Sequence, residues 1–412
     1  MKPWMKTDHS IFTPFIFRML FVLFFVEFVK GALLVTVLPV YMNSFLGLSA
    51  YTVGWALALQ YAGDNLFRTP MGFIVDRIGY RIGIVVGVVL SGVSVWIMAV
   101  ADQGVWMIAA ATLLGIGTSP LWPSVIAGAT AEAGEHVRGT MMSIVYAAWL
   151  SGTGLGPVVI NFFIRETTYR PAFWFLGGVL LCVLAVSLFL PDKHKQREQA
   201  QSVIHTARQT GLWARLKAYI ATVRSTVDVS PLFYPALFLQ NASIGLLAPV
   251  ITLYAKDVLQ LSNMMYSLFL VFGGGVTILL LYPSGKLVDR YGTRWLLHIG
   301  FLLGSAAIAM FALTTERTLV WIMVALIGFS YALIIPAWNA MIASYVPADR
   351  RALIWGFFLT IEGGGMVVGS ILSGRLWDSF GPQAPFFVSG LAMLTLFVLH
   401  LFISKPQQIV IR

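Results

Sequence analysis

Three ionisable candidate residues lie in long apolar stretches near the N-terminus, and a further charge, Arg68, accompanies them. Glu27 and Lys30 share one stretch, and their spacing of three residues places them on the same face of a helix. Asp64 lies in the next stretch, with Arg68 one turn further along on the same face. A charge at membrane depth costs roughly 2.5–3.5 kcal/mol on insertion scales, so an ionisable group there usually has a function. These residues predict a polar cavity in which a carboxylate takes up and releases a proton.

We assign this proton-carrying role first to Asp64 and second to Glu27. Burial and a neighbouring cation act in opposite directions on the proton affinity of a carboxyl group, so their balance can bring it into the working range. Lys30 is expected to hydrogen-bond the substrate or to exchange partners with Glu27. The alternative is a mutually neutralising cluster that only holds helices together. Apolar packing is often as stable as buried ion pairs, which makes the functional interpretation the favoured one.

Two tryptophans join this set of candidate substrate-binding residues. Trp122 stands between two prolines, and Trp149 closely precedes the segment that begins at Gly152. Both lie away from the expected water boundary. Indole faces stack on the C–H faces of sugar rings or attract cations. Simple packing of the two rings is the alternative.

Positioning these groups requires a bundle of membrane-spanning helices. Of the 412 residues, 58% are hydrophobic and 11% are charged, whereas soluble domains carry about 25% charged residues. Twelve apolar stretches lie near residues 15–42, 50–72, 82–100, 105–128, 140–164, 171–190, 229–256, 263–285, 295–313, 318–344, 352–375 and 384–404. Each is long enough to cross a hydrocarbon core of about 30 Å as a helix. The sequence therefore predicts an all-α integral membrane protein with 12 transmembrane helices.

A motif of glycines and charged residues occurs twice, after the second and after the eighth stretch. The two copies are Gly72-Phe-Ile-Val-Asp76-Arg77-Ile-Gly79-Tyr-Arg81 and Gly285-Lys-Leu-Val-Asp289-Arg290-Tyr-Gly292-Thr-Arg294. Their offset is 285 − 72 = 213 residues. Each copy lies between two apolar stretches, so it is predicted to be a tight loop at the water boundary, with glycines that allow close backbone approach.

The same offset relates the two halves of the chain from the first helix to the sixth without a gap. We therefore predict two pseudo-symmetric six-helix bundles, residues 1–190 and 229–412, joined by a cytoplasmic linker, residues 191–228. Apolar and basic residues recur at helical spacing in the linker, which favours an amphipathic helix on the inner membrane surface over a solvated segment. Two such bundles in the same orientation suit alternating access to a site between them.

The repeat also compares the candidate residues with their counterparts in the second half. The offset replaces Glu27, Lys30, Asp64 and Trp122 by Gln240, Ser243, Thr277 and Ile335, and it replaces Trp149 by Glu362. The first half thus keeps charged and aromatic groups where the second half is mostly neutral or apolar. We predict an asymmetric cavity that suits an amphipathic substrate. Glu362 is interpreted as a second proton site or, alternatively, as a hydrogen-bonding partner of a neighbouring helix.

The net charge of +10 at pH 7 follows the membrane topology. With the N-terminus inside, 19 of the 27 Lys and Arg residues fall on the cytoplasmic side and five fall outside. This bias predicts a cell-membrane protein with both termini in the cytoplasm. The positive net charge is therefore explained by topology, and we expect no nucleic-acid partner. The first apolar stretch is expected to remain as a membrane helix, and the single Cys182 to be a packed thiol. We expect no cofactor, no metal, no enzymatic activity and a monomer.

The duplicated loop motif resembles the signature of major facilitator transporters, and the resemblance covers essentially the whole chain. Gly152-x-x-x-Gly156-Pro157 is similar to the antiporter motif of proton-coupled members, although Ile160 and Asn161 stand where that motif usually continues with two glycines. The resemblance implies that the acid of the loop motif latches the outward-open state against the eleventh helix. The gating residues it implies are Gly72, Asp76, Arg77, Gly79, Arg81, Arg138, Gly152, Gly156, Pro157, Asp289 and Arg290.

A narrower resemblance concerns the candidate substrate-binding residues. Glu27, Lys30, Asp64, Trp122 and Trp149 resemble positions in proton-coupled flippases for the anchor glycolipid of lipoteichoic acid, which have arginine in place of Lys30. The resemblance implies a proton-coupled secondary transporter that moves a lipid-linked disaccharide between leaflets. The alternative is a multidrug–proton antiporter that exports hydrophobic or cationic compounds. The expected partners are protons, membrane lipids, and a lipid-linked sugar or hydrophobic small molecule.

Overall fold

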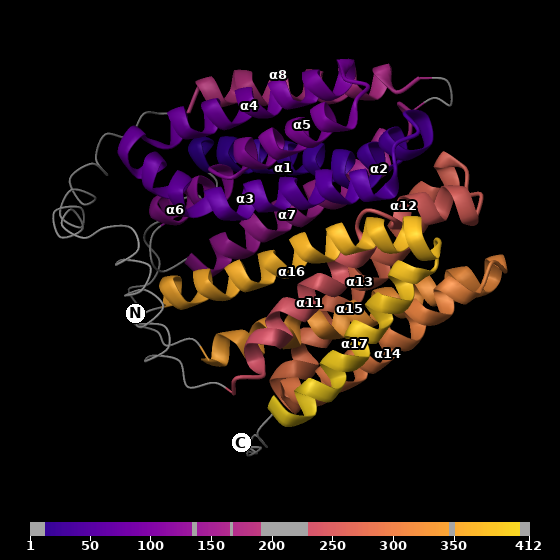
Figure 1. The fold of residues 1–412 in the computed structure, drawn as a ribbon. Helices are drawn as coiled ribbons and strands as arrows, with labels where there is room; N and C mark the ends of the chain where they lie inside the picture. The colour runs from indigo at the N-terminus through magenta and orange to yellow at the C-terminus, as the bar shows by residue number, and fades with distance from the viewer. Residues whose placement is uncertain (1–12, 134–137, 165–167, 191–229, 346–350, 404–412) are drawn as a thin grey trace, which may run out of the picture.

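The computed structural model describes residues 13–133, 138–164, 168–190, 230–345 and 351–403, and over these residues the fold is helical (Figure 1). Its first half contains α1 (Pro14–Gly31), which continues through η1 (Ala32–Val37), α2 (Leu38–Val40) and η2 (Tyr41–Phe45), then α3 (Ala50–Ile78), α4 (Tyr80–Val100), α5 (Gly104–Thr118), α6 (Leu121–Ala133), α7 (Arg138–Ile160) and α8 (Arg170–Leu188). The second half contains α11 (Phe233–Leu247), α12 (Ile251–Leu253), η6 (Tyr254–Val258), α13 (Asn263–Tyr291), α14 (Thr293–Leu313), α15 (Arg317–Tyr345), α16 (Arg351–Phe380) and α17 (Ala384–Ile403).

Within the described residues these elements make twelve membrane-crossing segments. Ten are long and apolar enough to span a membrane by hydropathy alone. The other two are α3, whose polar content includes Asp64 and Arg68, and α7, which has a shorter apolar part from Ile144 to Ile160. The prediction of an all-α membrane protein with twelve helices is confirmed.

The sequence repeat is visible in the local structure of the two halves. Ser49 caps α3 by accepting a hydrogen bond from the Thr52 amide, and Ser262, at 262 − 49 = 213, caps α13 in the same way. At the opposite ends of these helices, Gly79 and Gly292 have φ angles of 91° and 77°. A side chain is strained in that region, so glycine permits the sharp turn into the next helix.

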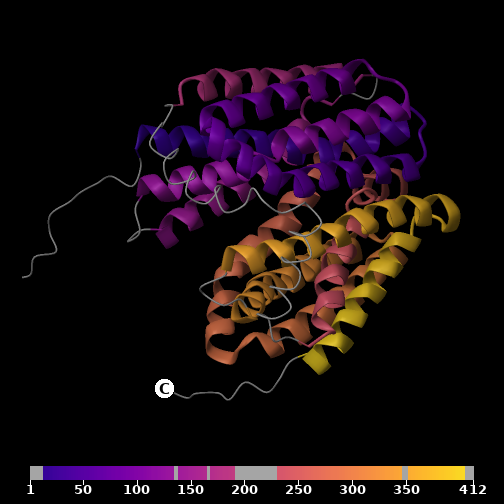
Figure 2. The ribbon, with the colours of Figure 1, turned by 60° about the vertical axis from the view of Figure 1, so that its left-hand side comes forward.

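The helices of each half lie together in the ribbon (Figures 1 and 2), and each half has its own buried core. One cluster of buried apolar residues runs from Phe15 to Leu190 and the other from Phe233 to Ile403, with Leu253 of the second half joining the first cluster. Glycines bring the helices of each half close together. A Cβ at Gly156 of α7 would lie 2.9 Å from the backbone nitrogen of Ala32, which is closer than packed atoms come.

The two halves meet along α3 and α16, which are antiparallel and in close contact. Near the start of α3, the Asp378 carboxylate at the end of α16 accepts hydrogen bonds from the backbone amides of Ala50 (3.1 Å) and Tyr51 (2.8 Å). We call this side of the bundle the Asp378 end, and the opposite side, where α3 turns into α4, the Gly79 end. Figure 1 shows the Asp378 end on the right, where α2 and α12 also lie in contact.

A second contact between the halves joins α7 to α13 at the Asp378 end. The Asn161 amide donates to the Ser267 hydroxyl at 3.0 Å and to the Pro157 carbonyl at 2.9 Å. The departure from the usual antiporter motif at Asn161 thus supplies a polar contact across the interface. The linker, residues 191–228, lies outside the described residues, so the bundle boundaries and the amphipathic helix stay predictions.

Candidate functional site

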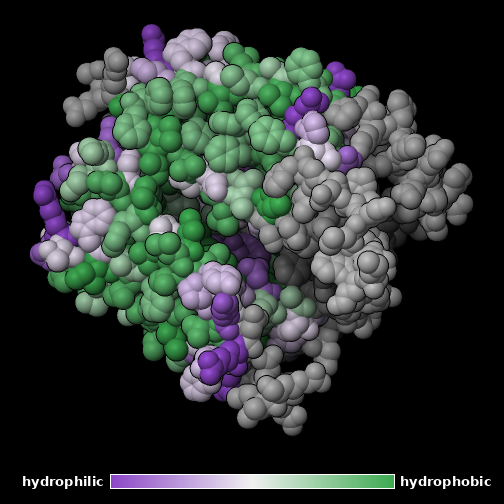
Figure 3. Space-filling view, turned by 180° about the vertical axis from the view of Figure 1, so that it is seen from behind, coloured by the Kyte–Doolittle hydropathy of each residue, from purple (hydrophilic) through white to green (hydrophobic). Residues whose placement is uncertain are grey.

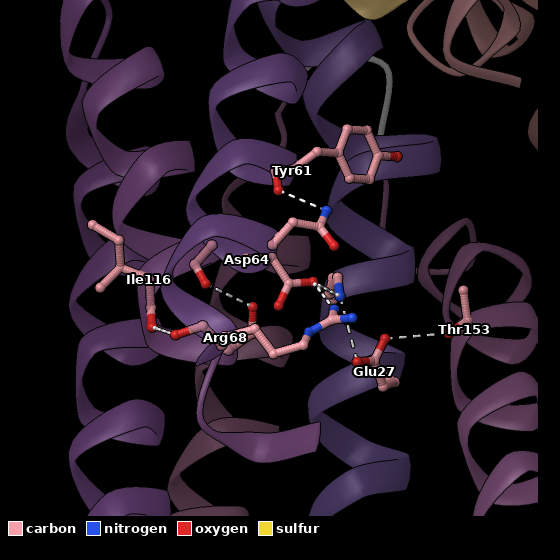
Figure 4. A network of polar contacts seen from close by, with 11 residues as sticks. Glu27, Tyr61, Asp64, Arg68, Ile116 and Thr153 are labelled. Atoms are coloured by element: carbon pink, nitrogen blue, oxygen red, sulfur yellow. Dashed lines mark hydrogen bonds and ion pairs between the residues drawn. The ribbon is translucent and has the colours of Figure 1, made fainter. Parts of the chain in front are cut away.

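Four charged side chains from α1 and α3 form one network (Figure 4). The Lys30 ammonium lies 2.8 Å from the Asp64 Oδ2 atom and 3.4 Å from the Glu27 Oε1 atom. The Arg68 Nη2 atom lies 3.2 Å from the same Asp64 oxygen. Lys30 therefore bridges two carboxylates on different helices, and its shorter contact is with Asp64, 34 residues away, rather than with Glu27 on its own helix.

Burial differs between the acids and the bases of this network. The side chains of Glu27 and Asp64 are 8% and 6% exposed, whereas those of Lys30 and Arg68 are 13% and 28% exposed. The carboxylates are thus nearly enclosed by protein, and Arg68 is the most exposed member of the network. Figure 3 shows hydrophilic surface in a recess between the two hydrophobic halves. Two acids and two bases balance in charge, which lowers the cost of holding them at membrane depth.

The second oxygen of Glu27 contacts α7. The Thr153 hydroxyl donates to Glu27 Oε2 at 3.4 Å, and the Thr153 backbone also lies against Gly31 of α1. Sequence reasoning missed Thr153 as part of the site. The signal in the sequence is its position between Gly152 and Gly156, because both glycines pack against α1.

An aromatic cluster lies on the neighbouring helices α6 and α7. The ring centroids of Trp122 and Trp149 are 5.9 Å apart, and Tyr146 lies 5.3 Å from Trp122 and 6.3 Å from Trp149. The two predicted tryptophans are therefore brought together. Tyr146 was missed, although its spacing of three residues from Trp149 puts both rings on one face of α7. Tyr146 is 43% exposed, so this cluster is open on one side.

The counterparts of these residues in the second half are engaged within their own half. The Ser243 hydroxyl donates to the Gln240 carbonyl, and the Asn241 amide donates to the Gln240 side chain at 2.8 Å. The Thr277 hydroxyl lies 2.9 Å from the carbonyl oxygen of Gly328 on α15. Ile335 is exposed and apolar. The second half carries hydrogen-bonded neutral groups at the depths where the first half carries the charged network.

Glu362 on α16 is held by a tryptophan. The Trp338 indole nitrogen on α15 donates to Glu362 Oε1 at 3.0 Å. This is the hydrogen bond to a neighbouring helix that the sequence offered as one of two interpretations. The next residue, Gly363, packs against the side chain of Asn65 on α3, since a Cβ there would lie 3.1 Å from the Asn65 Cγ atom. Glu362 is therefore adjacent to the interface between the halves.

The predicted gating residues are placed only in part. Gly79 forms the junction between α3 and α4, Arg81 is half-buried in the first turn of α4, and the Arg290 guanidinium lies 5.3 Å from the ring centroid of Tyr291. Gly152, Gly156 and Pro157 lie in α7, and both glycines pack against α1. Gly72 lies within α3. The side chains of Asp76, Arg77, Arg138 and Asp289 lie outside the described part of the chain, so their latch role stays a prediction.

Metal-binding residues do not gather anywhere in the described ranges. No group of three or more His, Cys, Asp or Glu side chains lies close enough there to hold a metal ion. His298 and His400 contact each other, with ring centroids 4.9 Å apart, within the second half. Cys182 on α8 is exposed, so the prediction of a packed thiol was wrong.

Sequence comparison identifies the class of protein. The family model of the Major Facilitator Superfamily matches residues 19–226 and 233–410. The chain therefore belongs to the Major Facilitator Superfamily of membrane transporters, and it is a secondary transporter rather than an enzyme. This agrees with the resemblance seen in the duplicated loop motif.

Curated relatives with a narrower description cover almost the whole chain. The proton-coupled antiporter flippase LtaA of Staphylococcus saprophyticus is 27% identical over 392 residues, which are 93% of this chain and 92% of the relative. LtaA of Staphylococcus aureus strain MSSA476 is 26% identical over 391 residues, 93% of each chain. The chain is thus similar to these flippases over almost its whole length.

Solved structures agree with the fold. The nucleoside transporter NupG superposes with a TM-score of 0.76 at 14% identity, covering 96% of this chain and all of NupG. A POT family transporter in complex with 5-aminolevulinic acid superposes with a TM-score of 0.73 at 15% identity, covering 95% of this chain and 96% of that transporter. At these identities the likeness concerns the architecture alone.

Proposed function

We propose that this protein is a proton-coupled flippase that moves a lipid-linked disaccharide from one membrane leaflet to the other. The observation that carries the proposal is the Lys30 bridge between Asp64 and Glu27, located in one half only. The similarity to proton-coupled antiporter flippases supports the same substrate class. Alternating access between the two halves would carry the head group past the midplane while the acyl chains stay in lipid.

The charged network suggests how a proton and a substrate exclude each other. With Asp64 ionised, Lys30 and Arg68 are both held at its carboxylate. A proton on Asp64 neutralises this acceptor, so Lys30 turns toward Glu27 or toward a substrate hydroxyl. Conversely, a sugar that draws Lys30 away leaves Asp64 with less positive charge nearby and raises its affinity for a proton from the opposite side. This exchange gives antiport.

The aromatic cluster is proposed to bind the sugar rings. Trp149 lies one helical turn from Thr153 on α7, and Thr153 contacts Glu27 on α1. The aromatic cluster is therefore next to the charged network. Aromatic faces cover the C–H faces of a sugar while the charged groups bind its hydroxyls. The apolar surface around Ile335 in the second half would then face the lipid chains. Glu362 is proposed as a second proton site. Its carboxylate becomes available to a proton when the hydrogen bond from Trp338 breaks.

The contacts between the halves suggest the direction in which this state is open. We propose that the Gly79 end faces the cytoplasm of the cell membrane, because the positive charges of the chain favour that orientation with both termini inside. The Asp378 end is joined by Asp378 and by Asn161. Access would then be from the cytoplasmic leaflet, and the latch made by the duplicated loop motif would form when the bundle rocks to the opposite state.

The alternative is a multidrug–proton antiporter. Aromatic rings and buried acids attract hydrophobic cations. In the first half, however, Glu27 and Asp64 are already balanced by Lys30 and Arg68, so no net negative charge remains to bind a cationic drug. This balance favours a neutral substrate with hydroxyl groups.

Reconstitution separates the two functions. Purified protein in proteoliposomes is given a fluorescently labelled diglucosyl diacylglycerol and a proton gradient of either sign. We expect the lipid to change leaflet in the presence of a gradient, with a reversal of direction when the gradient is reversed. Movement of a fluorescent hydrophobic cation under the same gradient, with no movement of the glycolipid, would instead show that the protein is a multidrug–proton antiporter.

A further inference from the structure

Arg68 has more hydrogen-bond donors than its protein partners use. A guanidinium group carries five N–H donors in a rigid plane. The Nη2 atom donates to Asp64, while no acceptor among the described residues lies within hydrogen-bond distance of the buried Nε atom. The side chain as a whole is 28% exposed, so part of the group faces open space. An arginine that is held through Nη2, has an unmatched Nε and is partly exposed has donors left for a ligand.

The surroundings of Arg68 place it beside the charged network of the proposed sugar site. One turn earlier in α3, the Asp64–Asn65 pair contacts Lys30 on one side and Gly363 of the other half on the other. Arg68 therefore lies one helical turn from a contact between α3 and α16. On α7, Tyr146 lies two helical turns before Thr153, the residue that contacts Glu27, and it belongs to the aromatic cluster. Both Arg68 and Tyr146 are therefore displaced from the Lys30 bridge toward the Gly79 end of the bundle.

Lys30 cannot supply this kind of contact. Its ammonium is a point charge that is already shared between Asp64 and Glu27. A guanidinium, in contrast, presents two parallel N–H groups that match two neighbouring oxygens. Lys30 is thus shared between two carboxylates, whereas Arg68 contacts one of them through Nη2 and has no partner for its Nε among the described residues.

We propose that Arg68, together with Tyr146, is the specificity-determining pair of the site, in which the guanidinium binds two adjacent hydroxyl oxygens of the sugar head group and the ring covers the sugar face. The inference rests on the proposed function and adds to it a named recognition element. Because the same guanidinium also contacts Asp64, sugar binding and the protonation of Asp64 are linked through one side chain.

The test is the Arg68→Lys variant, which keeps a positive charge near Asp64 and removes the paired donors. We measure the apparent KM for labelled diglucosyl diacylglycerol in proteoliposomes, and the inhibition constant of the free disaccharide head group. Loss of a hydrogen bond to a charged group weakens binding about tenfold or more. We expect both constants to rise about tenfold, with the maximal rate changed by less than about threefold. Arg18→Lys is the matched control, since Arg18 donates to the Phe189 carbonyl on α8, away from the network.

Each outcome decides between the possibilities. An unchanged KM in Arg68→Lys, with wild-type protein that flips the glycolipid, overturns this inference and leaves the proposed function standing. A raised KM without any change in inhibition by the free disaccharide shows that Arg68 acts on the lipid part, which also overturns it. Stronger inhibition of wild-type protein by inorganic phosphate than by the disaccharide assigns the guanidinium to an anion instead. Wild-type protein that neither binds the disaccharide nor flips the lipid refutes both proposals.

Discussion

Replacement of Asp64 by Asn is the most direct test of the charged network. The amide keeps the shape of the carboxylate but carries no charge and binds no proton. It turns two charge-assisted contacts, from Lys30 at 2.8 Å and Arg68 at 3.2 Å, into neutral-acceptor contacts. Each such change weakens a contact by about 1 kcal/mol. The remaining charges, two cations and Glu27, leave one uncompensated positive charge in the interior.

We therefore expect Asp64→Asn to lose gradient-driven glycolipid movement, at least about 100-fold, and to be less stable by roughly 2–4 kcal/mol. The protein should still be inserted, because one polar group in twelve apolar segments does not decide insertion. Transport is measured in proteoliposomes, and stability is measured as the midpoint of thermal unfolding in detergent. Glu316→Gln is the control, since Glu316 is an exposed acid that caps α15 far from the network.

A second substitution separates charge balance from proton carriage. Adding Lys30→Gln to Asp64→Asn leaves Glu27 and Arg68 as one acid and one base. The double variant should recover most of the lost thermal stability and none of the transport. If Asp64→Asn alone moved the lipid with a normal dependence on the proton gradient, Asp64 would not be the proton carrier and the mechanism proposed here would be wrong.

Three further predictions follow from the contacts described above. Glu27→Gln removes the second anion bound by Lys30 and should lower gradient-driven transport nearly as far as Asp64→Asn; unaltered turnover would show that Glu27 only packs against Thr153. Asp378→Ala removes the carboxylate that caps α3, worth about 1 kcal/mol. It should raise about fivefold the labelling of Ser370→Cys in a Cys182→Ala background, because Ser370 is a buried residue of α16 that packs against Gly54 of α3; unchanged labelling would mean that Asp378 does not hold this end closed. Gly156→Val places a side chain against the backbone of α1 and should lower the unfolding midpoint far more than Gly154→Val, because a Cβ at Gly154 meets open space; equal effects would contradict the close packing of α1 and α7.

The fold was accessible from the sequence because its determinants are local or repeated. The number of apolar stretches, their length and the offset of 213 residues predict twelve helices in two related halves. The serine caps and the glycine turns follow the same repeat, since capping and φ angles depend on neighbouring residues. The candidate polar residues were also visible, because a charge in an apolar stretch is costly enough to be noticed.

The partners of those residues were decided by the tertiary structure. Spacing along one helix pairs Glu27 with Lys30, but the shorter contact of Lys30 is with Asp64 on another helix, and its existence depends on how closely α1 and α3 approach. The hydrogen bond between Trp338 and Glu362, and the one between Asn161 and Ser267, likewise join separate helices.

Sequence alone therefore determined which groups this protein holds in the membrane and in which half, because burial of a charge has a cost that composition and periodicity reveal. Only the tertiary structure decided that Lys30 is shared between two carboxylates, while the Arg68 Nε atom has no partner in the described part of the chain. The physical reason is that a hydrogen bond requires approach within about 3 Å. Helices that pack through glycines set such distances between residues far apart in the chain, and no pattern along the chain encodes them.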